Sequence, residues 1–391
     1  MKALVFGYGR SGKAAEASLR RAGHSVTALD GDAAFPDGAF DVAVVSPGIA
    51  LSHPWIVEAK RRGVPLKSEL QLGCEELKRQ GWKLLAVTGS KGKSSVVKAV
   101  ADAINLAGGH AVACGNYGLP VCEVAQGDPE TRQEAEDAKE RWAVVEVSSF
   151  MMETTAMPAD TFAAAAVLNL QEDHLDRHGS VEVYHGLKRK LLTMALRTVE
   201  PDGADAALLG GSHFDNEILR PNGLVAIGLM RVAGLSEDEI GRAFAEFRPL
   251  PHRMNVIGDF GGIRCIDDSK ATSVAALEAG VRMAGTGVRL IAGGLAKGDD
   301  PETALSTLTK RVKKVYLIGR CAEKFALAWR NAVDCEICGT LQKAVAVSMR
   351  EAVKGETVLL SPGTASFDQF KSFGERGDVF ARLVKQEGQN K

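Results

Sequence analysis

A short apolar run that ends in a glycine-containing turn constrains the fold of this chain more than any other feature. Residues 84–87 read Leu-Leu-Ala-Val, and residues 88–95 read Thr-Gly-Ser-Lys-Gly-Lys-Ser-Ser before a segment of helical periodicity. A buried strand, a tight turn and a helix in this order favour a phosphate-binding loop, because backbone N–H groups and the helix N-terminus attract anions. In such a loop Lys93 would reach the outer phosphates and the Ser94 hydroxyl would ligate Mg²⁺.

The loop is shorter than the common form of this motif. The common pattern has its first glycine five residues before the Gly-Lys pair, where this chain has Val87, and its leading glycine is instead Gly89. An ordinary strand-to-helix turn is the alternative interpretation. The ordered succession of strand, glycines, lysine, hydroxyl and helix favours the phosphate site.

Strand and helix signals alternate along the chain and predict an α/β fold with parallel sheets and ligand loops at the strand ends. We expect a helix at 12–22, a solvated charged helix near 128–141, and one or two helices within 223–247. We expect strands at 2–6, 25–29, 42–45, 142–147, 162–170, 263–266, 288–291, 315–318 and 357–360.

The first predicted strand runs into a second glycine-rich turn. Residues 7–12 read Gly-Tyr-Gly-Arg-Ser-Gly, and Asp30 ends the next predicted strand. A dinucleotide fold has this pattern, and so does any Rossmann-like domain that holds a nucleotide diphosphate at a helix N-terminus. The motif alone is weak support for a nicotinamide cofactor.

Composition excludes several classes of protein. The chain has 391 residues, which suggests two or three domains, and a net charge of −1, which gives no bias toward nucleic acid or anionic membranes. No apolar run reaches the roughly 18–20 residues that span a bilayer, and residues 1–7 lack the longer apolar stretch and cleavage site of a signal peptide, so we expect none. Seven scattered cysteines fit reduced cytoplasmic thiols, and we read the Cys335/Cys338 pair as structural.

Acidic and polar residues mark further candidate sites. Glu146 interrupts an apolar strand, where a carboxylate is costly unless paired, protonated or bound to a cation, so we favour Mg²⁺ over a solvent-facing strand end. His174 lies among acids, and a metal or catalytic role and a structural role are equally open. Arg253 and the polar loops 267–272, 293–300 and 361–368 would suit a nucleotide and a carboxylate substrate, although each alone is compatible with a solvated loop.

Together these segments resemble the ATP-dependent Mur ligases over nearly the whole chain, and within them the branch that adds D-glutamate. The segments that carry the resemblance are 46–51, 88–94, 115–118, 146–150, 172–177, 251–253, 267–272 and 360–370. The Asp-Ser-Lys-Ala-Thr run at 268–272 and the Ser-Phe-Asp-Gln-Phe run at 366–370 are the most specific of them.

The resemblance implies three domains: a Rossmann-like N-terminal domain at 1–81 for a UDP-sugar, a shortened P-loop-type ATPase domain at 82–248, and a Rossmann-like C-terminal domain at 249–391 for the amino acid. It implies an ATP-dependent amide ligase that adds D-glutamate to UDP-N-acetylmuramoyl-L-alanine through an acyl phosphate, in peptidoglycan precursor synthesis. ATP and two Mg²⁺ ions are the implied cofactors. We expect a cytoplasmic monomer that binds no nucleic acid and does not insert into membranes.

The resemblance also assigns roles to individual residues. Lys93, His174 and Lys188 would be catalytic, and Ser94, Glu146, His174 and Lys188 would hold the metal ions, with Lys188 carbamylated and Lys190 its close competitor. ATP would contact Gly89, Ser90, Lys91, Gly92, Lys93, Ser94, Ser95, Asn116, Arg253 and Asp268. The UDP-sugar would contact Arg10, Ser11, Asp30, Ser46, Gly48 and Ser148. D-Glutamate would contact Thr272, Lys297, Ser366 and Phe367.

The chain departs from the family pattern in places. Lys91 stands where asparagine is usual in the loop, and Ser273 stands where asparagine is usual after the 268–272 run. The interval 188–251 is short, and 211–216 retains only part of the usual Gly-x-His-Asn sequence, so the adenine contacts are the least secure. The alternatives are a Rossmann-type oxidoreductase, which leaves the 88–95 loop unexplained, and a non-catalytic Mur ligase homologue.

Overall fold

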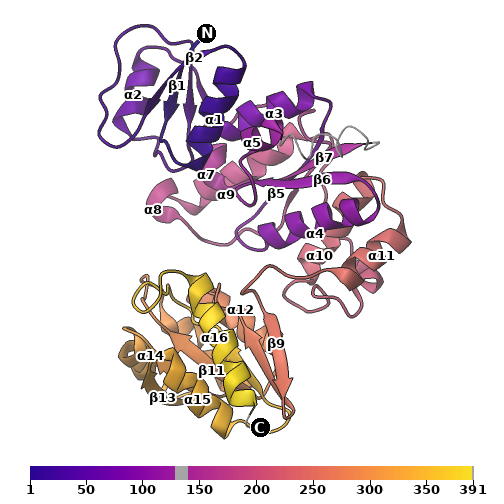
Figure 1. The fold of residues 1–391 in the computed structure, drawn as a ribbon, viewed down its shortest axis with the longest axis vertical. Coiled ribbons are helices and arrows are strands. Elements are labelled where there is room, and N and C mark those ends of the chain that lie inside the picture. The colour runs from indigo at the N-terminus through magenta and orange to yellow at the C-terminus, as the bar shows by residue number, and fades with distance from the viewer. Residues whose placement is uncertain (128–139, 390–391) are drawn as a thin grey trace. The chain divides into compact units, whose positions relative to one another are not determined.

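A computed structural model describes residues 1–127 and 140–389 of the chain (Figure 1). The charged helix predicted near 128–141 falls largely on residues 128–139, which lie outside the described residues. The described chain divides into two compact units, one comprising Met1–Asp215 and Leu219–Phe247 and the other comprising Asn216–Ile218 and Arg248–Lys391. Each unit is described by itself.

The first unit begins with a four-stranded parallel sheet in the order β2-β1-β3-β4. Its strands are β1 (Lys2–Phe6), β2 (Ser25–Leu29), β3 (Val42–Val45) and β4 (Leu66–Ser68), and its helices are α1 (Arg10–Arg21), α2 (Pro54–Arg61) and α3 (Glu69–Arg79). The predicted strands 2–6, 25–29 and 42–45 are confirmed. β1 is central and almost continuously apolar because both faces of the sheet are covered.

The same unit contains a second parallel sheet of four strands in the order β6-β7-β5-β8. Its strands are β5 (Lys83–Thr88), β6 (His110–Gly115), β7 (Arg141–Glu146) and β8 (Ala164–Val167). The surrounding helices are α4 (Lys93–Leu106), α5 (Val121–Gln126), α7 (Ser149–Met152), α8 (Leu175–His178), α9 (Val181–Lys190), η1 (Leu191–Met194), η2 (Gly203–Leu209), α10 (Arg220–Val232) and α11 (Glu237–Glu246).

Alternate residues of β5 enter two different hydrophobic cores, as the period of two in a strand requires. Leu85 and Val87 pack with α4, α10 and α11, whereas Leu84 and Ala86 pack with α3, α5 and α7. Because both faces are covered, ligand loops of this sheet are confined to its edges, and the phosphate loop leaves from the carboxyl end of β5.

The second unit is built on a six-stranded sheet in the order β13-β12-β11-β14-β10-β9, parallel except for β9 (Figure 1). Its strands are β9 (Asn255–Phe260), β10 (Ile263–Asp267), β11 (Val288–Gly293), β12 (Val312–Ile318), β13 (Asp334–Gly339) and β14 (Thr357–Leu360). Its helices are α12 (Val274–Ala284), η3 (Pro301–Ala304), α13 (Leu305–Arg311), α14 (Ala322–Trp329), α15 (Leu341–Glu351) and α16 (Phe373–Gly388). Helices α12 to α14 cover one face, and α15 and α16 cover the other.

The Cys335/Cys338 pair lies on edge strand β13, with the two side chains in the cores on opposite faces of the sheet. Burial raises the pKa of each thiol to about 11. Neither a disulfide nor a shared metal fits that arrangement, and all seven cysteines are reduced. Among the described residues, no helix combines the length and apolarity needed to cross a bilayer.

Candidate active site

The phosphate-binding loop joins β5 to α4, as the sequence predicts. Gly92 caps the helix with φ of +85°, a left-handed conformation that L-residues rarely adopt. An added Cβ at Gly92 would also meet the side chain of Asn222, with its Cγ at 3.0 Å. Backbone conformation and packing therefore both require glycine at this position.

Asn169, directly after β8, holds the loop in shape. Its Oδ1 accepts the N–H of Lys91 at 2.9 Å, its Nδ2 donates to the Lys91 carbonyl at 2.8 Å, and its own carbonyl accepts the N–H of Ser90 at 2.9 Å. These three hydrogen bonds tie residues 90 and 91 of the loop to the segment after β8. Sequence reasoning missed this role, although an asparagine directly after an apolar run is a visible signal.

Two lysine side chains converge on one carbonyl of the loop. Lys93 Nζ donates to the carbonyls of Gly89 and Ser90 at 2.9 and 3.1 Å, and Lys188 Nζ donates to the same Gly89 carbonyl at 2.8 Å. Lys188 is buried, and burial together with the charge of Lys93 lowers the pKa of its amine to about 7. A large fraction of this amine is therefore neutral near physiological pH.

Glu146 ends β7 beside the loop, paired in register with Val87 of β5. Its side chain is 2% exposed, and its Oε1 accepts from Asn116 Nδ2 at 2.7 Å. Its Oε2 is buried without a hydrogen-bond partner. A buried carboxylate oxygen with no partner is costly, so this position is suited to a cation.

No group of three or more His, Cys, Asp or Glu side chains that could hold a metal occurs among residues 1–127 and 140–389. A cation next to Glu146 would therefore take its remaining ligands from hydroxyl groups, phosphate oxygens and water. Such a sparse set of protein ligands suits Mg²⁺, which is usually held by one or two carboxylates together with substrate phosphates.

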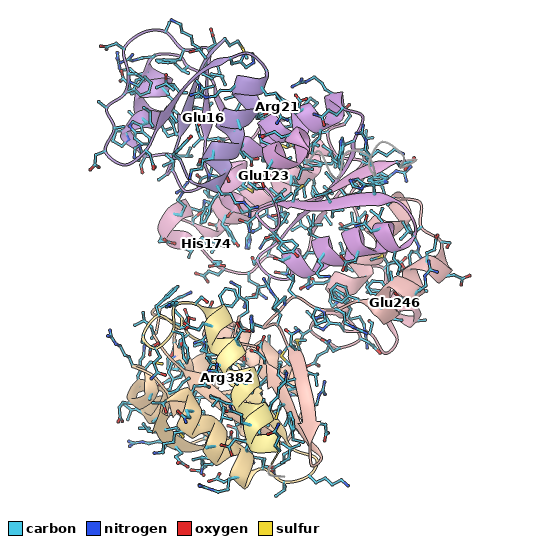
Figure 2. All side chains as sticks on the ribbon, in the orientation of Figure 1. Glu16, Arg21, Glu123, His174, Glu246 and Arg382 are labelled. Atoms are coloured by element: carbon cyan, nitrogen blue, oxygen red, sulfur yellow. The ribbon has the colours of Figure 1, made fainter. Side chains whose placement is uncertain are left out.

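His174 lies at the start of α8 with φ of +54° and its side chain about half exposed (Figure 2). Its ring centroid is 4.8 Å from that of Phe150 and 6.1 Å from that of Tyr184. The Tyr184 hydroxyl is 3.1 Å from Ser90 Oγ, and Lys188 Nζ lies 4.5 Å from the centre of the Tyr184 ring. Tyr184 thus joins His174 and Lys188 to the loop, a role that sequence reasoning missed.

Asn222 is a second residue that sequence reasoning missed at this site. It is buried in the first turn of α10, and its amide lies against Gly92. The segment 211–216, which was expected to carry the corresponding motif, instead contributes His213 to an aromatic cluster with Phe214 and Phe247. Burial there lowers the pKa of His213 to about 4.

The expected UDP-sugar residues lie at the carboxyl ends of strands in the first unit. Arg10 and Ser11 open α1, Asp30 follows β2, Ser46 and Gly48 follow β3, and Ser148 follows β7. Ser46 Oγ donates to the carbonyl of Gly7 at 2.8 Å, and the Tyr8 N–H donates to Asp30 Oδ1 at 3.3 Å. Arg10 donates to the carbonyl of Gly118, in the loop after β6, at 3.1 Å.

The remaining expected residues lie in the second unit, at or beside the carboxyl edge of its sheet. Asp268 follows β10 and is buried, and its carboxylate accepts from Ser361 Oγ at 2.8 Å and from the Met254 N–H at 3.3 Å. Burial raises the pKa of Asp268 to about 7. Arg253, Thr272, Lys297, Ser366 and Phe367 occupy the loops before β9 and after β10, β11 and β14.

Arg376 of α16 organises that edge and was not anticipated. It is fully buried, with Nε donating to Ser269 Oγ at 2.9 Å and Nη2 donating to the carbonyls of Ser269 and Thr364 at 2.9 and 3.1 Å. These bonds hold the loop after β10 to the loop after β14. Burial lowers the pKa of the guanidinium to about 10.

Two family models match the chain. Residues 87–198 match the Mur ligase middle domain, and residues 252–363 match the Mur ligase glutamate ligase domain. Among curated proteins, the UDP-N-acetylmuramoylalanine–D-glutamate ligases of Acidobacterium capsulatum and Myxococcus xanthus are 31% and 32% identical, with 98% of this chain covered in both and 96% and 98% of those proteins covered. The first alignment spans 455 positions, more than the 391 residues of this chain, so that relative carries segments that this chain lacks.

Solved structures support the fold at low sequence identity. The UDP-N-acetylmuramate–alanine ligase of Thermotoga maritima has a TM-score of 0.57 at 17% identity, with 100% of this chain and 99% of that chain covered. The MurF ligase of Thermotoga maritima, solved in complex with ADP, has a TM-score of 0.58 at 14% identity, with 90% and 96% covered.

Proposed function

The chain belongs to the Mur ligase family, and from that premise we propose that it joins D-glutamate to UDP-N-acetylmuramoyl-L-alanine with cleavage of ATP to ADP and phosphate in peptidoglycan precursor synthesis. The observation that carries the proposal is identity of 31–32% to D-glutamate ligases along 98% of the chain. A phosphate loop with the unpartnered Glu146 oxygen beside it supports the same conclusion.

We propose three functional regions, each with its own sheet: 1–81 for the UDP-sugar, 82–248 for ATP, and 249–391 for D-glutamate. The three separate sheets support this division. Residues for the UDP-sugar and for D-glutamate are those expected from the sequence, and Asn222 joins the proposed nucleotide contacts because its amide lies against Gly92.

The phosphate loop would stabilise ATP with N–H groups and charge. The N-terminus of α4 carries partial positive charge, and Lys93 would exchange its bonds to the Gly89 and Ser90 carbonyls for phosphate oxygens. Asn169 fixes the conformation of the loop, so little of it must reorganise when phosphate binds.

Mg²⁺ fits this site because Glu146 Oε2 is buried without a partner. We propose that Ser94 and Glu146 hold one ion and that His174 and Lys188 hold a second. Bound Mg²⁺ supplies positive charge that offsets the charge developing on the transferring phosphoryl group.

In the proposed reaction, a carboxylate oxygen of the L-alanine residue attacks the γ-phosphorus of ATP, and ADP leaves. The amine of D-glutamate then attacks the acyl phosphate, the C–O bond breaks, and phosphate leaves with an amide formed. Lys93 would stabilise the first transition state. Lys297, Thr272, Ser366 and the backbone of Phe367 would orient the carboxylates of D-glutamate.

Lys188 is the residue we propose to be carbamylated. Its buried amine has a pKa of about 7, so the neutral form can attack CO₂, form an N–C bond and release a proton. The competitor Lys190 instead donates to the Thr155 carbonyl at 2.6 Å. A carbamate at Lys188 would place a negative charge beside Lys93, so that the two side chains attract each other.

The cellular compartment, the oligomeric state and the alternative functions complete the proposal. We propose a cytoplasmic monomer without nucleic-acid partners, and the reduced cysteines support the compartment. An oxidoreductase is not favoured, because it leaves the phosphate loop and Glu146 without a role. A non-catalytic homologue is not favoured either, because the chain is 31–32% identical to D-glutamate ligases along 98% of its length.

Phosphate release from ATP tests the proposal. The purified protein is incubated with UDP-N-acetylmuramoyl-L-alanine, ATP and Mg²⁺, with D-glutamate, L-glutamate or no amino acid. We expect release that depends on D-glutamate and is lost in K93A with its melting temperature retained. Release that is independent of D-glutamate, or full activity in K93A, would contradict the proposal.

A further inference from the structure

Four buried or partly buried polar side chains form a network between α7 and α8. Ser149 Oγ is 3.0 Å from His178 Nε2, His178 Nδ1 is 3.3 Å from Glu153 Oε1, and Arg177 pairs with Glu153 Oε2 at 2.6 Å. A carboxylate only accepts hydrogen bonds, so it favours the proton on Nδ1 and leaves Nε2 to accept the Ser149 hydroxyl. This tautomer is assigned from the contacts of the ring.

The order serine, histidine, carboxylate is that of an activated nucleophile, but burial excludes that role here. Ser149 is 2% exposed, and the side chain of His178 is 1% exposed. A nucleophile must reach the reacting atom of its substrate, and a hydroxyl at this depth does not. These polar side chains therefore act on neighbouring residues of the protein and not on a substrate.

The neighbours of His178 lead directly to the phosphate loop. Its ring stacks on that of Tyr184 with centroids 5.6 Å apart and an interplanar angle of 28°, and it packs 5.3 Å from Phe150. Tyr184 is 1% exposed, its hydroxyl is 3.1 Å from Ser90 Oγ, and its ring lies under Lys188 Nζ. One aromatic stack thus connects the polar chain to two residues of the proposed ATP and metal site.

We propose that His178 is a positioning residue that fixes Tyr184, and through it the phosphate loop and Lys188, in the geometry needed for phosphoryl transfer. This inference rests on the proposed function of the loop. The hydrogen bond to Ser149 and the contact with Glu153 fix the ring plane of His178, and the stacking contact passes that orientation to Tyr184.

Arg177, at the other end of this polar network, contacts the segment proposed to bind the UDP-sugar. Arg177 Nη2 donates to the carbonyls of Pro47 and Ile49 at 3.3 and 2.8 Å, while the same guanidinium pairs with Glu153. One buried network therefore supports the proposed binding loops of both nucleotides. Displacement of His178 should therefore weaken binding of nucleotides at these loops.

Three variants test the inference. H178F keeps a ring on Tyr184 and removes both ring nitrogens, whereas H178Q keeps a hydrogen-bonding group toward Ser149 and removes the ring that stacks on Tyr184. H110F is the control, since it makes the same histidine-to-phenylalanine substitution at the amino end of β6. The His110 ring there packs with its centroid 5.5 Å from that of Trp82. The melting temperature, kcat, the KM of each substrate and the Kd of a fluorescent ATP analogue are measured for each variant.

We expect H178F to lower kcat about tenfold and to raise the Kd of the analogue about fivefold, as the loss of one or two buried hydrogen bonds allows. The KM for D-glutamate should stay within about twofold, because its proposed residues belong to the other unit. H178Q, which lacks the ring that stacks on Tyr184, should be impaired at least as much as H178F, and H110F should match the wild type in kcat and Kd.

Wild-type kcat and Kd in H178F would overturn the inference, and so would an equal rise in the KM for D-glutamate or wild-type kcat and Kd in H178Q. If H178F does not fold, S149A, which removes the hydrogen bond to Nε2, is measured in its place. If the wild type shows no turnover with D-glutamate, the proposed function fails but the Kd of the analogue still decides: weakened binding in H178F supports the positioning role, and unchanged binding overturns it.

Discussion

Alanine at Gly92 should damage both the stability and the activity of the protein, for separable reasons. The backbone there has φ of +85°, which costs an L-residue about 1–2 kcal/mol. The new Cβ would also press on the buried amide of Asn222, with Cγ at 3.0 Å, and such overpacking costs about 1–3 kcal/mol. The free energy of unfolding should therefore fall by about 2–5 kcal/mol in total.

Gly108 offers a matched control at the other end of the same helix. Its φ is +84°, and an added Cβ would meet no atom within 4 Å. G108A should therefore show the backbone cost alone, and the difference between the two variants isolates the contact with Asn222. Denaturant unfolding measures the free energy of unfolding of each variant. Adding N222A to G92A removes the crowded amide and should restore the stability that G92A loses to overpacking.

Activity should separate the two glycine variants more sharply than stability. G92A displaces N–H groups that would hold phosphate, and misplacement by about 1 Å can lower a rate about a hundredfold. G108A should release phosphate at the wild-type rate. Equal unfolding free energies for G92A and G108A would refute the packing argument, and full activity in G92A would refute the phosphate loop.

The other predictions concern buried charges. E146Q should lower Mg²⁺-dependent phosphate release by at least about a hundredfold, while its melting temperature should not fall, because a buried carboxylate with an unpartnered oxygen becomes a neutral amide. In CO₂-free buffer, the free energy of unfolding of K188M should exceed that of the wild type by the largest amount below pH 7, where the buried ammonium of the wild type is charged. That gain should shrink as pH rises from about 7 toward 10, because the pKa of Lys188 is lowered to about 7 in the folded protein. Asp268 has its pKa raised by burial from 3.8 to about 7, so the folded state holds a proton that the unfolded state releases, and stability falls as pH rises between these values. D268N should remove that fall, which amounts to about 4 kcal/mol at most, and urea unfolding at pH 4 and pH 8 measures it.

Elements with strong local signals could be predicted from the sequence. Strands β1, β3 and β5 are largely apolar runs, and β2 places Ser and Thr between apolar residues. Each of the four ends at a glycine or polar turn, and the loop after β5 carries its own motif. Glu146 could be recognised because a single acid in a buried strand is anomalous. The structure buries it, with one oxygen unpartnered.

The two edge strands of the second unit were missed for a physical reason. β9 and β13 each pair with only one neighbour, mix polar with apolar residues and contain a glycine. Such segments bury little, so their composition resembles that of loops. β4 has only three residues, too few to show a period.

Site residues that act through tertiary contacts were also missed. Asn222 and Arg376 lie in helices whose local pattern is ordinary, and each becomes informative only when the fold brings it to a distant loop. Tyr184 stands four residues before Lys188, so helix geometry could have put the two on one face. Its contact with Ser90 required the structure.

The transfer of a labelled oxygen tests the central claim most directly. UDP-N-acetylmuramoyl-L-alanine is labelled with oxygen-18 in its free carboxylate and incubated with ATP, Mg²⁺, D-glutamate and the protein, and the products are analysed by mass spectrometry. An acyl phosphate requires one labelled oxygen in the released phosphate for each D-glutamyl amide formed. Amide without label in phosphate, or phosphate released without amide, would contradict the account.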